Sequence, residues 1–350
     1  MPMTPQNSES DKVTASVLVP ILNEEGFLPD TLPAMLDQDF GEPIEFLLLD
    51  GGSTDRTLEV LAEFAAGDDR IRVLDNPGRI QSKALNIGLA AARGEFIVRM
   101  DAHTYYPREY LRTGVNRLRR GDVAWVGGPQ LPLGTGGWSS RIAAAMETRL
   151  GVGGASFRFV PRTEFVTDAA FTGVLSRELL HELGGWDEDW LVNEDGELAA
   201  RVRESGGVIV CVPEMAAKCV TRDSLTGLGR QYFKYGYDRA KTAHRHPGSL
   251  RRSHLIPPAL GLATLAAAIT PRPLRRVARL ALAAYAVALG WSGSRAVTDH
   301  GLRIGGPVPL VLAVMHYSWA IGFFQGWRRE YGRRGTGDGS RDGGRDSTPG

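Results

Sequence analysis

The sequence is poor in cysteine and almost free of net charge. Its 350 residues contain two cysteines, Cys211 and Cys219, which cannot build a disulfide framework and favour a reducing, cytoplasmic setting. A formal charge of +1 argues against a general nucleic-acid-binding protein. The N-terminal segment MPMTPQNSESDKVT lacks an apolar core, so we expect no secretory signal peptide. The first apolar run leads into PILNEEG without a G-x-G-x-x-G motif, which disfavours a dinucleotide-dependent oxidoreductase.

The charges that are present are divided unevenly along the chain. Residues 1–224 carry 22 basic and 34 acidic side chains, a formal charge of −12, whereas residues 225–350 carry 19 basic and 6 acidic ones, a formal charge of +13. The composition, 43% hydrophobic and 23% charged residues, is that of a folded chain with a sizeable core. We therefore expect an acidic region joined to a basic region of a different kind.

Short apolar runs alternate with amphipathic stretches in the first half. We predict strands at 15–19, 44–49, 71–74, 96–100 and 123–126, and helices at 31–37, 54–64, 82–92, 108–118, 171–183 and 194–204. Strand–helix alternation with short connections predicts an α/β domain with a mainly parallel sheet flanked by helices. The carboxyl ends of such strands are the usual ligand sites.

The basic region contains three uncharged apolar stretches, 255–271, 280–294 and 304–327. A helix that spans the hydrocarbon core needs roughly 20 apolar residues, which only the third stretch supplies. The arginines that flank the first stretch and follow the third place those ends on the cytoplasmic side. We expect a membrane hairpin from the second and third stretches, with the first in the near leaflet. Buried helices of a soluble domain are the alternative.

Four acidic motifs lie where predicted strands end or a predicted helix begins. They contain Asn23, Glu24 and Glu25 in PILNEEG; Asp50 in LLLDGGSTD; Asp101 and His103 in RMDAH; and Glu194 and Asp195 in VNEDGEL. An aspartate at a strand-to-helix turn commonly caps the helix, so each motif alone is weak. All four in this order indicate one functional site.

PILNEE, DGGSTD, KALNIG, DAH and NED, in this order, resemble the inverting family 2 glycosyltransferases of the GT-A fold. The long segment FTGVLSRELLHELGGWDEDWLVNEDGEL and the later RQYFKYGYDRAK are similar to the succinoglycan-biosynthesis ExoA-like branch. The resemblance covers about residues 14–325. It implies a GT-A nucleotide-sugar-binding fold and sugar transfer in exopolysaccharide or cell-envelope synthesis. A catalytically silent membrane scaffold that keeps the fold is the alternative.

The resemblance also implies a donor site for a nucleoside-diphosphate sugar. Its residues would be Pro20, Asn23, Glu24, Asp50, Gly51, Ser53, Lys83 and Asp101. A carboxylate such as Asp50 can accept the imide N–H of a pyrimidine base, which favours a UDP-type donor, and Gly51 leaves room for the ring. A solvated lysine at a helix start is an equal alternative for Lys83.

A departing diphosphate needs its negative charge neutralised, and a divalent cation held by oxygen ligands does this. The resemblance gives Asp101 as a metal ligand. The family usually has a second aspartate where His103 stands. Imidazole binds Mn²⁺ more readily than Mg²⁺, so either ion stays open. A loop histidine that hydrogen-bonds locally is the alternative for His103.

An inverting transfer needs one carboxylate to take the proton of the acceptor hydroxyl. Asp195 matches the family's general-base position and Glu194 is its neighbour. The alternative is helix capping by Asn193, with acids in the first turn that suit the helix dipole.

Further contacts to acceptor or phosphate are implied for Asp168, Arg230, Gln231 and Lys234. RQYFKYGYDRAK resembles the family's Q-x-x-R-W element without its Arg-Trp ending, and an interfacial helix at lipid headgroups is the other interpretation. A buried structural aspartate is equally plausible for Asp168.

These expectations define a membrane-attached enzyme at the plasma membrane with its catalytic domain in the cytoplasm and a lipid-linked or glycan acceptor. The expected divisions are a disordered N-terminus (1–13), the GT-A domain (14–224), a basic aromatic interfacial segment (225–254), membrane-associated helices (255–327) and a disordered polar tail (328–350).

Overall fold

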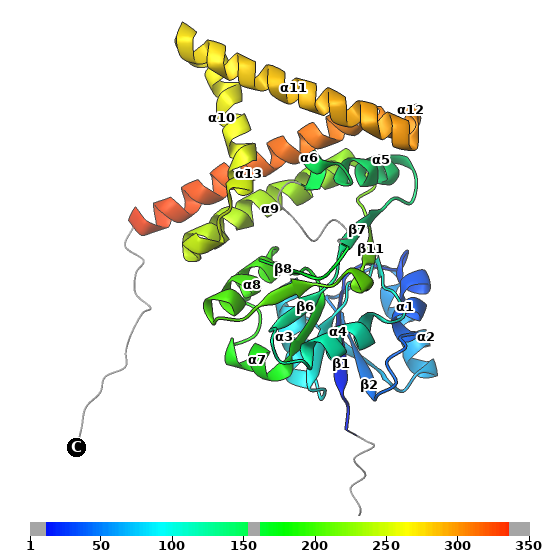
Figure 1. The fold of residues 1–350 in the computed structure, drawn as a ribbon. Coiled ribbons are helices and arrows are strands. Elements are labelled where there is room, and N and C mark those ends of the chain that lie inside the picture. The colour runs from blue at the N-terminus through cyan, green and yellow to red at the C-terminus, as the bar shows by residue number, and fades with distance from the viewer. Residues whose placement is uncertain (1–11, 153–161, 336–350) are drawn as a thin grey trace, which may run out of the picture.

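The computed structural model describes residues 12–152 and 162–335 (Figure 1). Most of the expected N-terminal and C-terminal disordered segments thus lie outside the described residues. The strands are β1 (Ala15–Ile21), β2 (Ile44–Asp50), β3 (Ile71–Asp75), β4 (Phe96–Arg99), β5 (Thr104–Tyr105), β6 (Trp125–Gly127), β7 (Gln130–Leu133), β8 (Phe165–Thr167), β9 (Gly173–Ser176), β10 (Ile209–Cys211) and β11 (Ala217–Val220).

The α-helices of the α/β domain are α1 (Leu28–Leu36), α2 (Thr57–Gly67), α3 (Gln81–Ala91), α4 (Tyr110–Leu118), α5 (Gly137–Met146), α6 (Arg149–Val152), α7 (Arg177–Glu182) and α8 (Glu194–Glu204). The C-terminal α-helices are α9 (Leu225–Arg245), α10 (Ile256–Ile269), α11 (Arg272–His300), α12 (Leu302–Gly305) and α13 (Val308–Gly335). Short 3₁₀ helices lie at Pro213–Met215, Pro247–Ser249 and Arg252–Leu255.

The central sheet has eight strands in the order β3-β2-β1-β4-β9-β6-β10-β8. Strands β3, β2, β1 and β4 are parallel, as are β6 and β10. Strand β9 is antiparallel to both β4 and β6, and β8 is antiparallel to β10. The sheet is therefore mixed, and our expectation of a mainly parallel sheet holds for its first four strands.

Strand β9 also corrects one predicted helix. We expected residues 171–183 to be helical throughout, but the first part pairs with β4 and β6 and only Arg177–Glu182 forms a helix. Val174 packs into the core on one face of the sheet and Leu175 into the core on the other. This alternation is strand periodicity, and long-range pairing overrides the local helical pattern.

Two apolar layers cover the central sheet. Helices α1, α2 and α4 bury side chains such as Leu32 and Leu111 against one face, together with Val17 of β1. Helices α3, α7 and α8 bury side chains such as Leu85 against the other face, together with Leu18. Alternate residues of β1 thus enter opposite layers, which is why this strand is apolar along its length.

A second, small sheet extends the domain towards the C-terminal helices. Strand β11 pairs in parallel with β7 and antiparallel with β5. Figure 1 shows β7 and β11 rising from the α/β domain towards α5 and α9. This sheet places the segment that follows β4 next to β11, because Thr104 of β5 pairs with Cys219 of β11.

The C-terminal helices form a separate layer above the α/β domain. Helix α13 lies along α9, and the two come so close that a side chain at Gly236 would collide with the backbone of Trp319, and one at Gly322 with the backbone of Phe233. Tyr232 of α9 and Leu312 of α13 share an apolar core with α5. Small residues at these positions allow the helix backbones to touch.

One helical segment of the described residues, Leu302–Gly332, is long and apolar enough to cross a membrane. It contains the third predicted stretch, 304–327. The second predicted stretch, 280–294, is the middle of the 29-residue helix α11, which begins among arginines. Among the described residues, the third stretch passes this test of length and composition and the second does not, so the spanning hairpin stays a prediction. Helix α13 continues to Gly335, eight residues beyond the boundary we expected for the polar tail.

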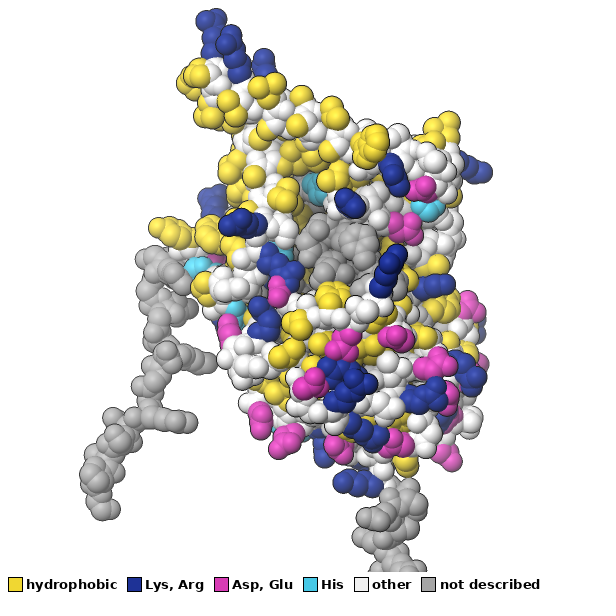
Figure 2. Space-filling model, viewed as in Figure 1, with side chains coloured by type: hydrophobic (Ala, Val, Ile, Leu, Met, Phe, Trp, Pro, Cys, Tyr) yellow, Lys and Arg dark blue, Asp and Glu magenta, His cyan; other side chains and the backbone are white. Residues whose placement is uncertain are grey.

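Apolar side chains are exposed on the outer helices. Figure 2 shows them over α10 and α11, whereas charges of both signs cover the α/β domain below. The exposed residues include Ile256, Leu262, Leu265 and Ile269 of α10 and Leu274, Val277, Leu280, Val287 and Trp291 of α11. Soluble monomers rarely expose apolar patches of this extent, so this face is suited to a lipid or protein surface.

Candidate active site

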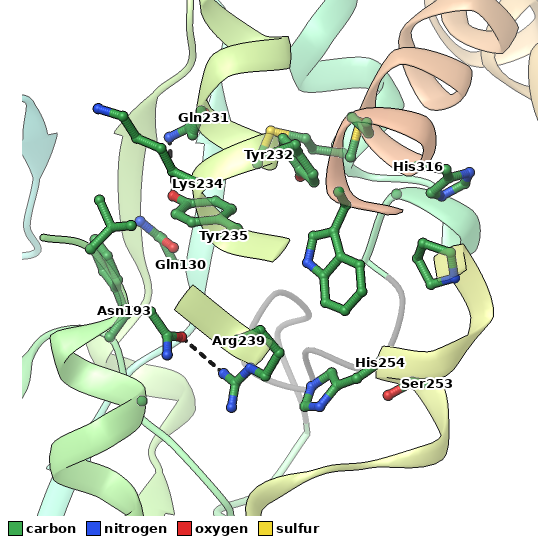
Figure 3. A pocket seen from close by; sticks show the side chains of 18 of the residues that line it. Gln130, Asn193, Gln231, Tyr232, Lys234, Tyr235, Arg239, Ser253, His254 and His316 are labelled. Atoms are coloured by element: carbon green, nitrogen blue, oxygen red, sulfur yellow. Dashed lines mark hydrogen bonds between the residues drawn. The ribbon is translucent and has the colours of Figure 1, made fainter. Parts of the chain in front are cut away.

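A large cavity lies between the α/β domain and the C-terminal helices (Figure 3). Its volume is about 1110 Å³. Polar residues of the α/β domain, among them Asp101 and Asp195, line one part, and apolar residues of α10 and α13, among them Leu260 and Trp319, line another. A molecule bound here would contact carboxylates and apolar side chains at the same time.

A buried arginine connects two acidic motifs that are far apart in the sequence. Nη1 of Arg99 lies 3.0 Å from Oε1 of Glu194, and its Nε lies 3.3 Å from Oδ1 of Asp101. The guanidinium also lies over the ring of Phe171, and only 3% of the side chain is exposed. Because a buried charge needs partners, Arg99 fixes the start of α8 against the end of β4.

The two carboxylates at the start of α8 have different surroundings. Glu194 points inward to Arg99; burial raises its pKa to about 7, while Arg99 opposes this rise. Asp195 is less enclosed, and its Oδ1 accepts a hydrogen bond of 2.7 Å from the backbone N–H of Gly196. Burial raises the pKa of Asp195 as well, again against Arg99. Of the two, Asp195 is the more accessible to a molecule bound in the cavity.

The residue before this pair, Asn193, adopts a left-handed conformation with φ of 62°. Its side chain does not cap α8, so the capping alternative for Asn193 is wrong. The amide instead accepts a hydrogen bond of 2.9 Å from Nη2 of Arg239 and donates one of 3.0 Å to Oγ1 of Thr242. Figure 3 shows the contact with Arg239 at the cavity. Helix α9 therefore holds a strained turn next to Asp195.

Asp101 and His103 both line the cavity. Nδ1 of His103 lies 3.0 Å from Oε1 of Glu24, so the other ring nitrogen, Nε2, could bind a metal ion only after it loses its proton. Metal-binding histidines commonly have such a carboxylate on the other ring nitrogen. Burial opposes protonation of His103, but contacts with Cys219 and Glu24 hold its pKa well above the usual value.

The donor set for a divalent cation is small. Within residues 12–152 and 162–335, no three histidine, cysteine or acidic side chains are grouped so that they could hold a metal ion. The carboxylate of Asp101 and the imidazole of His103, which Glu24 orients, would suit an ion whose other ligands come from a bound substrate.

The carboxylate of Asp50 shapes the turn after β2. It accepts hydrogen bonds from the backbone N–H of Gly52 at 2.8 Å and from the hydroxyl of Ser53 at 2.6 Å. Asn23 connects this turn to the loop after β1, because its Oδ1 accepts a bond of 2.8 Å from the N–H of Thr54. Asp50 is 2% exposed. The structure thus gives Asp50 the turn-forming role that an aspartate at this position can have.

The remaining predicted donor residues lie near these loops and do not line the cavity. Pro20 is in β1, and the N–H of Gly51 donates to the carbonyl of Ile21 at 2.8 Å. Lys83, in the first turn of α3, lies 4.0 Å from Glu188 with 43% of its side chain exposed. This matches the surface-lysine alternative for Lys83.

Four predicted acceptor or phosphate contacts, Asp168, Arg230, Gln231 and Lys234, all line the cavity. Asp168 forms an ion pair with Arg251. Gln231 donates a hydrogen bond of 3.0 Å to the hydroxyl of Tyr235, and both are on α9 (Figure 3). The structure therefore places these four predicted contact residues in the same cavity as Asp101, His103, Glu194 and Asp195.

Comparison with known proteins identifies the family of the chain. The family model of glycosyl transferase family 2 matches residues 16–184. The chain is 30% identical over 327 residues to the succinoglycan biosynthesis protein ExoA of Rhizobium meliloti (strain 1021), an alignment that covers 91% of this chain and 96% of ExoA. The chain belongs to glycosyl transferase family 2.

Two other similar proteins are more distant. A dolichyl N-acetyl-α-D-glucosaminyl phosphate 3-β-D-2,3-diacetamido-2,3-dideoxy-β-D-glucuronosyltransferase of Methanococcus voltae is 26% identical over 230 residues, 63% of this chain and 71% of that protein. The mannosyltransferase PcManGT of Pyrobaculum calidifontis, solved with GDP-Man and Mn²⁺, is 20% identical with a TM-score of 0.57 and 86% of each chain covered. The fold is thus the GT-A-like fold of glycosyltransferases.

The family 2 motifs pointed to the acidic residues but missed three basic ones. Arg99 interrupts the apolar run FIVRM, and a charge inside a buried strand is a signal for a buried partner. Arg239 and His254 both line the cavity, yet neither belongs to a motif that we singled out residue by residue. Their importance comes from the packing of α9 and the following segment over the α/β domain.

Proposed function

We propose that this glycosyltransferase moves a sugar, with inversion, from a nucleoside-diphosphate sugar to a lipid-linked or membrane-surface glycan acceptor. The observation that carries the proposal is the single cavity in which Asp195 and Asp101 share a space with apolar helices α10 and α13. A soluble acceptor would not need an apolar wall next to the carboxylates.

On the donor side, we propose that the loops after β1 and β2 bind the nucleotide. The turn built by Asp50, Gly51 and Ser53 is tightly hydrogen-bonded and is joined to Asn23 and Glu24, which supports a rigid nucleotide site there. Both carboxylate oxygens of Asp50 already accept hydrogen bonds from Gly52 or Ser53, so the imide N–H of a pyrimidine would share these acceptors. A UDP-type donor is our preferred proposal because a carboxylate at this turn matches an imide N–H.

We propose that Asp101 and His103 hold a Mg²⁺ or Mn²⁺ ion together with oxygens of the donor diphosphate. Such an ion would stabilise the charge of the departing diphosphate. Asp101 is oriented by Arg99 and His103 by Glu24, so both side chains are positioned by neighbours from other elements.

We propose that Asp195 is the general base. Its less enclosed position and raised pKa support this role, since a base works best when its pKa lies near the working pH. Glu194 is held inward by Arg99 and orients the turn without touching the acceptor.

The acceptor proposal also rests on the relatives. ExoA is named for succinoglycan biosynthesis, and the Methanococcus voltae protein for a dolichyl-phosphate-linked sugar acceptor. We place the enzyme at the plasma membrane, with the exposed apolar side chains of α10 and α11 in contact with lipid and the catalytic domain in the cytoplasm. Arg329 of α13 donates a hydrogen bond of 2.8 Å to Tyr237 of α9, which supports a cytoplasmic end of α13. A reporter fused after residue 350 should read cytoplasmic, and an external reading would contradict this placement.

The first experiment identifies the donor. Purified full-length protein is screened by thermal unfolding with UDP-, GDP- and dTDP-sugars in the presence of Mn²⁺, and each stabilising donor is then tested for nucleoside diphosphate release with a membrane extract as acceptor source. We expect a UDP-sugar to raise the unfolding temperature and to be consumed. If no nucleotide sugar stabilises the protein or is consumed, the proposed function is wrong.

A further inference from the structure

Two basic side chains on neighbouring helices line the cavity, and one of them lies next to the segment that contains Asp195. Arg203 of α8 and Arg239 of α9 both line the cavity, and a Cβ atom at Gly196 would lie 3.1 Å from Nη2 of Arg239. The guanidinium of Arg239 is therefore in contact with the residue that follows Asp195. Nη2 donates to Asn193, while Nε and Nη1 have no hydrogen-bond partner among the residues that the structure describes.

His254 adds a neutral donor to this part of the cavity. Its Nδ1 accepts a hydrogen bond of 3.2 Å from the backbone N–H of Arg251, which assigns the ring proton to Nε2. Burial, assisted by Arg239 and Arg251, lowers the pKa of His254 to about 3, so the ring is neutral at physiological pH. Figure 3 shows His254 and Arg239 on the same side of the cavity.

The cationic side chains in this part of the cavity outnumber the carboxylates that interact with them. Arg251 has an ion pair with Asp168, whereas the hydrogen bond of Arg239 goes to the neutral amide of Asn193. Arg239 interacts with Asp195 and with Arg203 through their charges, attractively with the first and repulsively with the second. Burial and Arg203 both lower the pKa of Arg239, while Asp195 raises it. A partly buried cation pair with unused N–H groups is a favourable place for an anion.

The surroundings of this cluster suggest which anion. On the side away from Asp195, the cavity is lined by Ile256, Pro257 and Leu260 of α10, and the ring of His254 lies 6.4 Å from that of Trp319 of α13. An occupant therefore has a negative group at Arg239 and an apolar portion along α10 and α13. A phosphate attached to a hydrocarbon chain has this pattern, and a nucleoside diphosphate does not.

We propose that Arg239, Arg203 and His254 bind a phosphate group of the lipid carrier to which the acceptor is attached. This assignment rests on the proposed function, because it places the lipid-linked acceptor in the same cavity as Asp195. Arg239 and Arg203 supply the charge, His254 supplies an N–H donor, and α10 and α13 contact the hydrocarbon chain. The phosphate of the nucleotide donor is the other source of the same chemistry, and the experiment separates the two.

The test compares two ligands on the full-length protein in detergent. Phytanyl phosphate is the lipid probe, the uncharged alcohol phytanol is its control, and UDP with Mn²⁺ is the nucleotide probe. The variants are Arg239→Gln and His254→Phe, which keeps an aromatic ring against Trp319 but removes the N–H. Arg245→Gln is the matched control, since it removes a guanidinium from the same helix that pairs with Asp187 outside the cavity. Thermal unfolding verifies that each variant is folded.

We expect the wild-type protein to bind phytanyl phosphate at least tenfold more tightly than phytanol. Arg239→Gln should abolish this preference and His254→Phe should reduce it, while UDP binding changes less than twofold and Arg245→Gln resembles the wild type. Loss of UDP binding with unchanged phytanyl phosphate binding would assign the cluster to the donor diphosphate and overturn the proposal. Equal binding of phytanol and phytanyl phosphate by the wild type would also overturn it. Both readouts are binding constants, which do not depend on a working transfer assay. The phosphate-site proposal can therefore fail while the proposed function stands, and the proposed function can fail while the phosphate site stands.

Discussion

Nη1 of Arg99 lies 3.0 Å from Oε1 of Glu194, and both side chains are almost completely enclosed. Arg99 ends a central strand and Glu194 begins a helix nearly a hundred residues later, so this pair joins two segments that are distant in the sequence. Since Arg99 also reaches Asp101, one guanidinium holds both the proposed metal ligand and Glu194, the residue before the proposed base.

This pair gives a test of stability. Arg99→Gln should lower the free energy of unfolding by about 3–5 kcal/mol, because it leaves Glu194 buried without its cation. Glu194→Gln in the Arg99→Gln background should recover part of that loss, since no uncompensated charge then remains in the pair. Urea unfolding of the two single variants and the double variant measures the coupling. Strictly additive losses would show that the two side chains do not interact.

A buried carboxylate on α9 predicts a pH dependence. Asp238 is 6% exposed and accepts a hydrogen bond of 3.2 Å from the N–H of Val192. Burial raises its pKa from 3.8 to about 6, although Lys241 opposes this. Between these two pH values the folded protein binds more protons than the unfolded chain, so its stability falls as pH rises through this window.

Asp238→Asn should remove that dependence and retain an oxygen for Val192. Relative to the wild type, the variant should gain little at pH 4 and roughly 2–3 kcal/mol at pH 8. Asp69→Asn, at an exposed position, is the control and should show no such trend. Denaturant unfolding at pH 4, 6 and 8 measures the difference, and a variant less stable than the wild type at pH 8 would refute the argument.

The metal proposal predicts cooperation between ion and nucleotide. Because the proposed site has two protein ligands and no group of three among the described residues, Mn²⁺ should bind weakly alone and at least tenfold more tightly with UDP present. Asp101→Ala should weaken both Mn²⁺ and UDP binding, and His103→Asp should shift the preference towards Mg²⁺. Calorimetric titration with each ion measures this. Full transfer activity in excess chelator would exclude the metal altogether.

The contact of α9 with α13 can be tested at a glycine. A methyl group at Gly322 would collide with the backbone of Phe233, so Gly322→Ala should force the helices apart and lower the unfolding temperature by several degrees. Gly290→Ala in α11 is the matched control, because no atom lies within 4 Å of the added Cβ. Its unfolding temperature should stay equal or rise slightly, since alanine favours the helix. Equal unfolding temperatures for both variants would mean that α13 does not pack on α9 in this way.

Local patterns predicted much of the α/β domain. The strands beginning at Ala15, Ile44 and Ile71 start at the predicted residues, because buried parallel strands form continuous apolar runs. The sequence around Val174 failed as a guide, since its strand exists only through pairing with β4 and β6. Local periodicity does not report long-range pairing of this kind.

The candidate site was likewise predicted only in part. Asp101, Glu194 and Asp195 lie in recognisable motifs, and all three line one cavity. The contacts that orient them were not predicted: Arg99 and Glu194 meet across the fold, and Asn193 bonds to Arg239, which follows it by 46 residues. Such contacts depend on how α8 and α9 are placed, which no short motif encodes.

The central claim, that this family 2 enzyme uses Asp195 as the base of sugar transfer, is tested most directly by nucleoside diphosphate release. The rate with a stabilising sugar donor and a membrane acceptor fraction is measured for the wild type, Asp195→Asn and Asp189→Asn, an exposed control in the preceding loop. Asp195→Asn should lower kcat by roughly a hundredfold or more, with donor affinity nearly unchanged, while Asp189→Asn keeps the wild-type rate. A wild-type rate for Asp195→Asn would contradict the account and move the base to another carboxylate of the cavity, Asp168 being the next candidate.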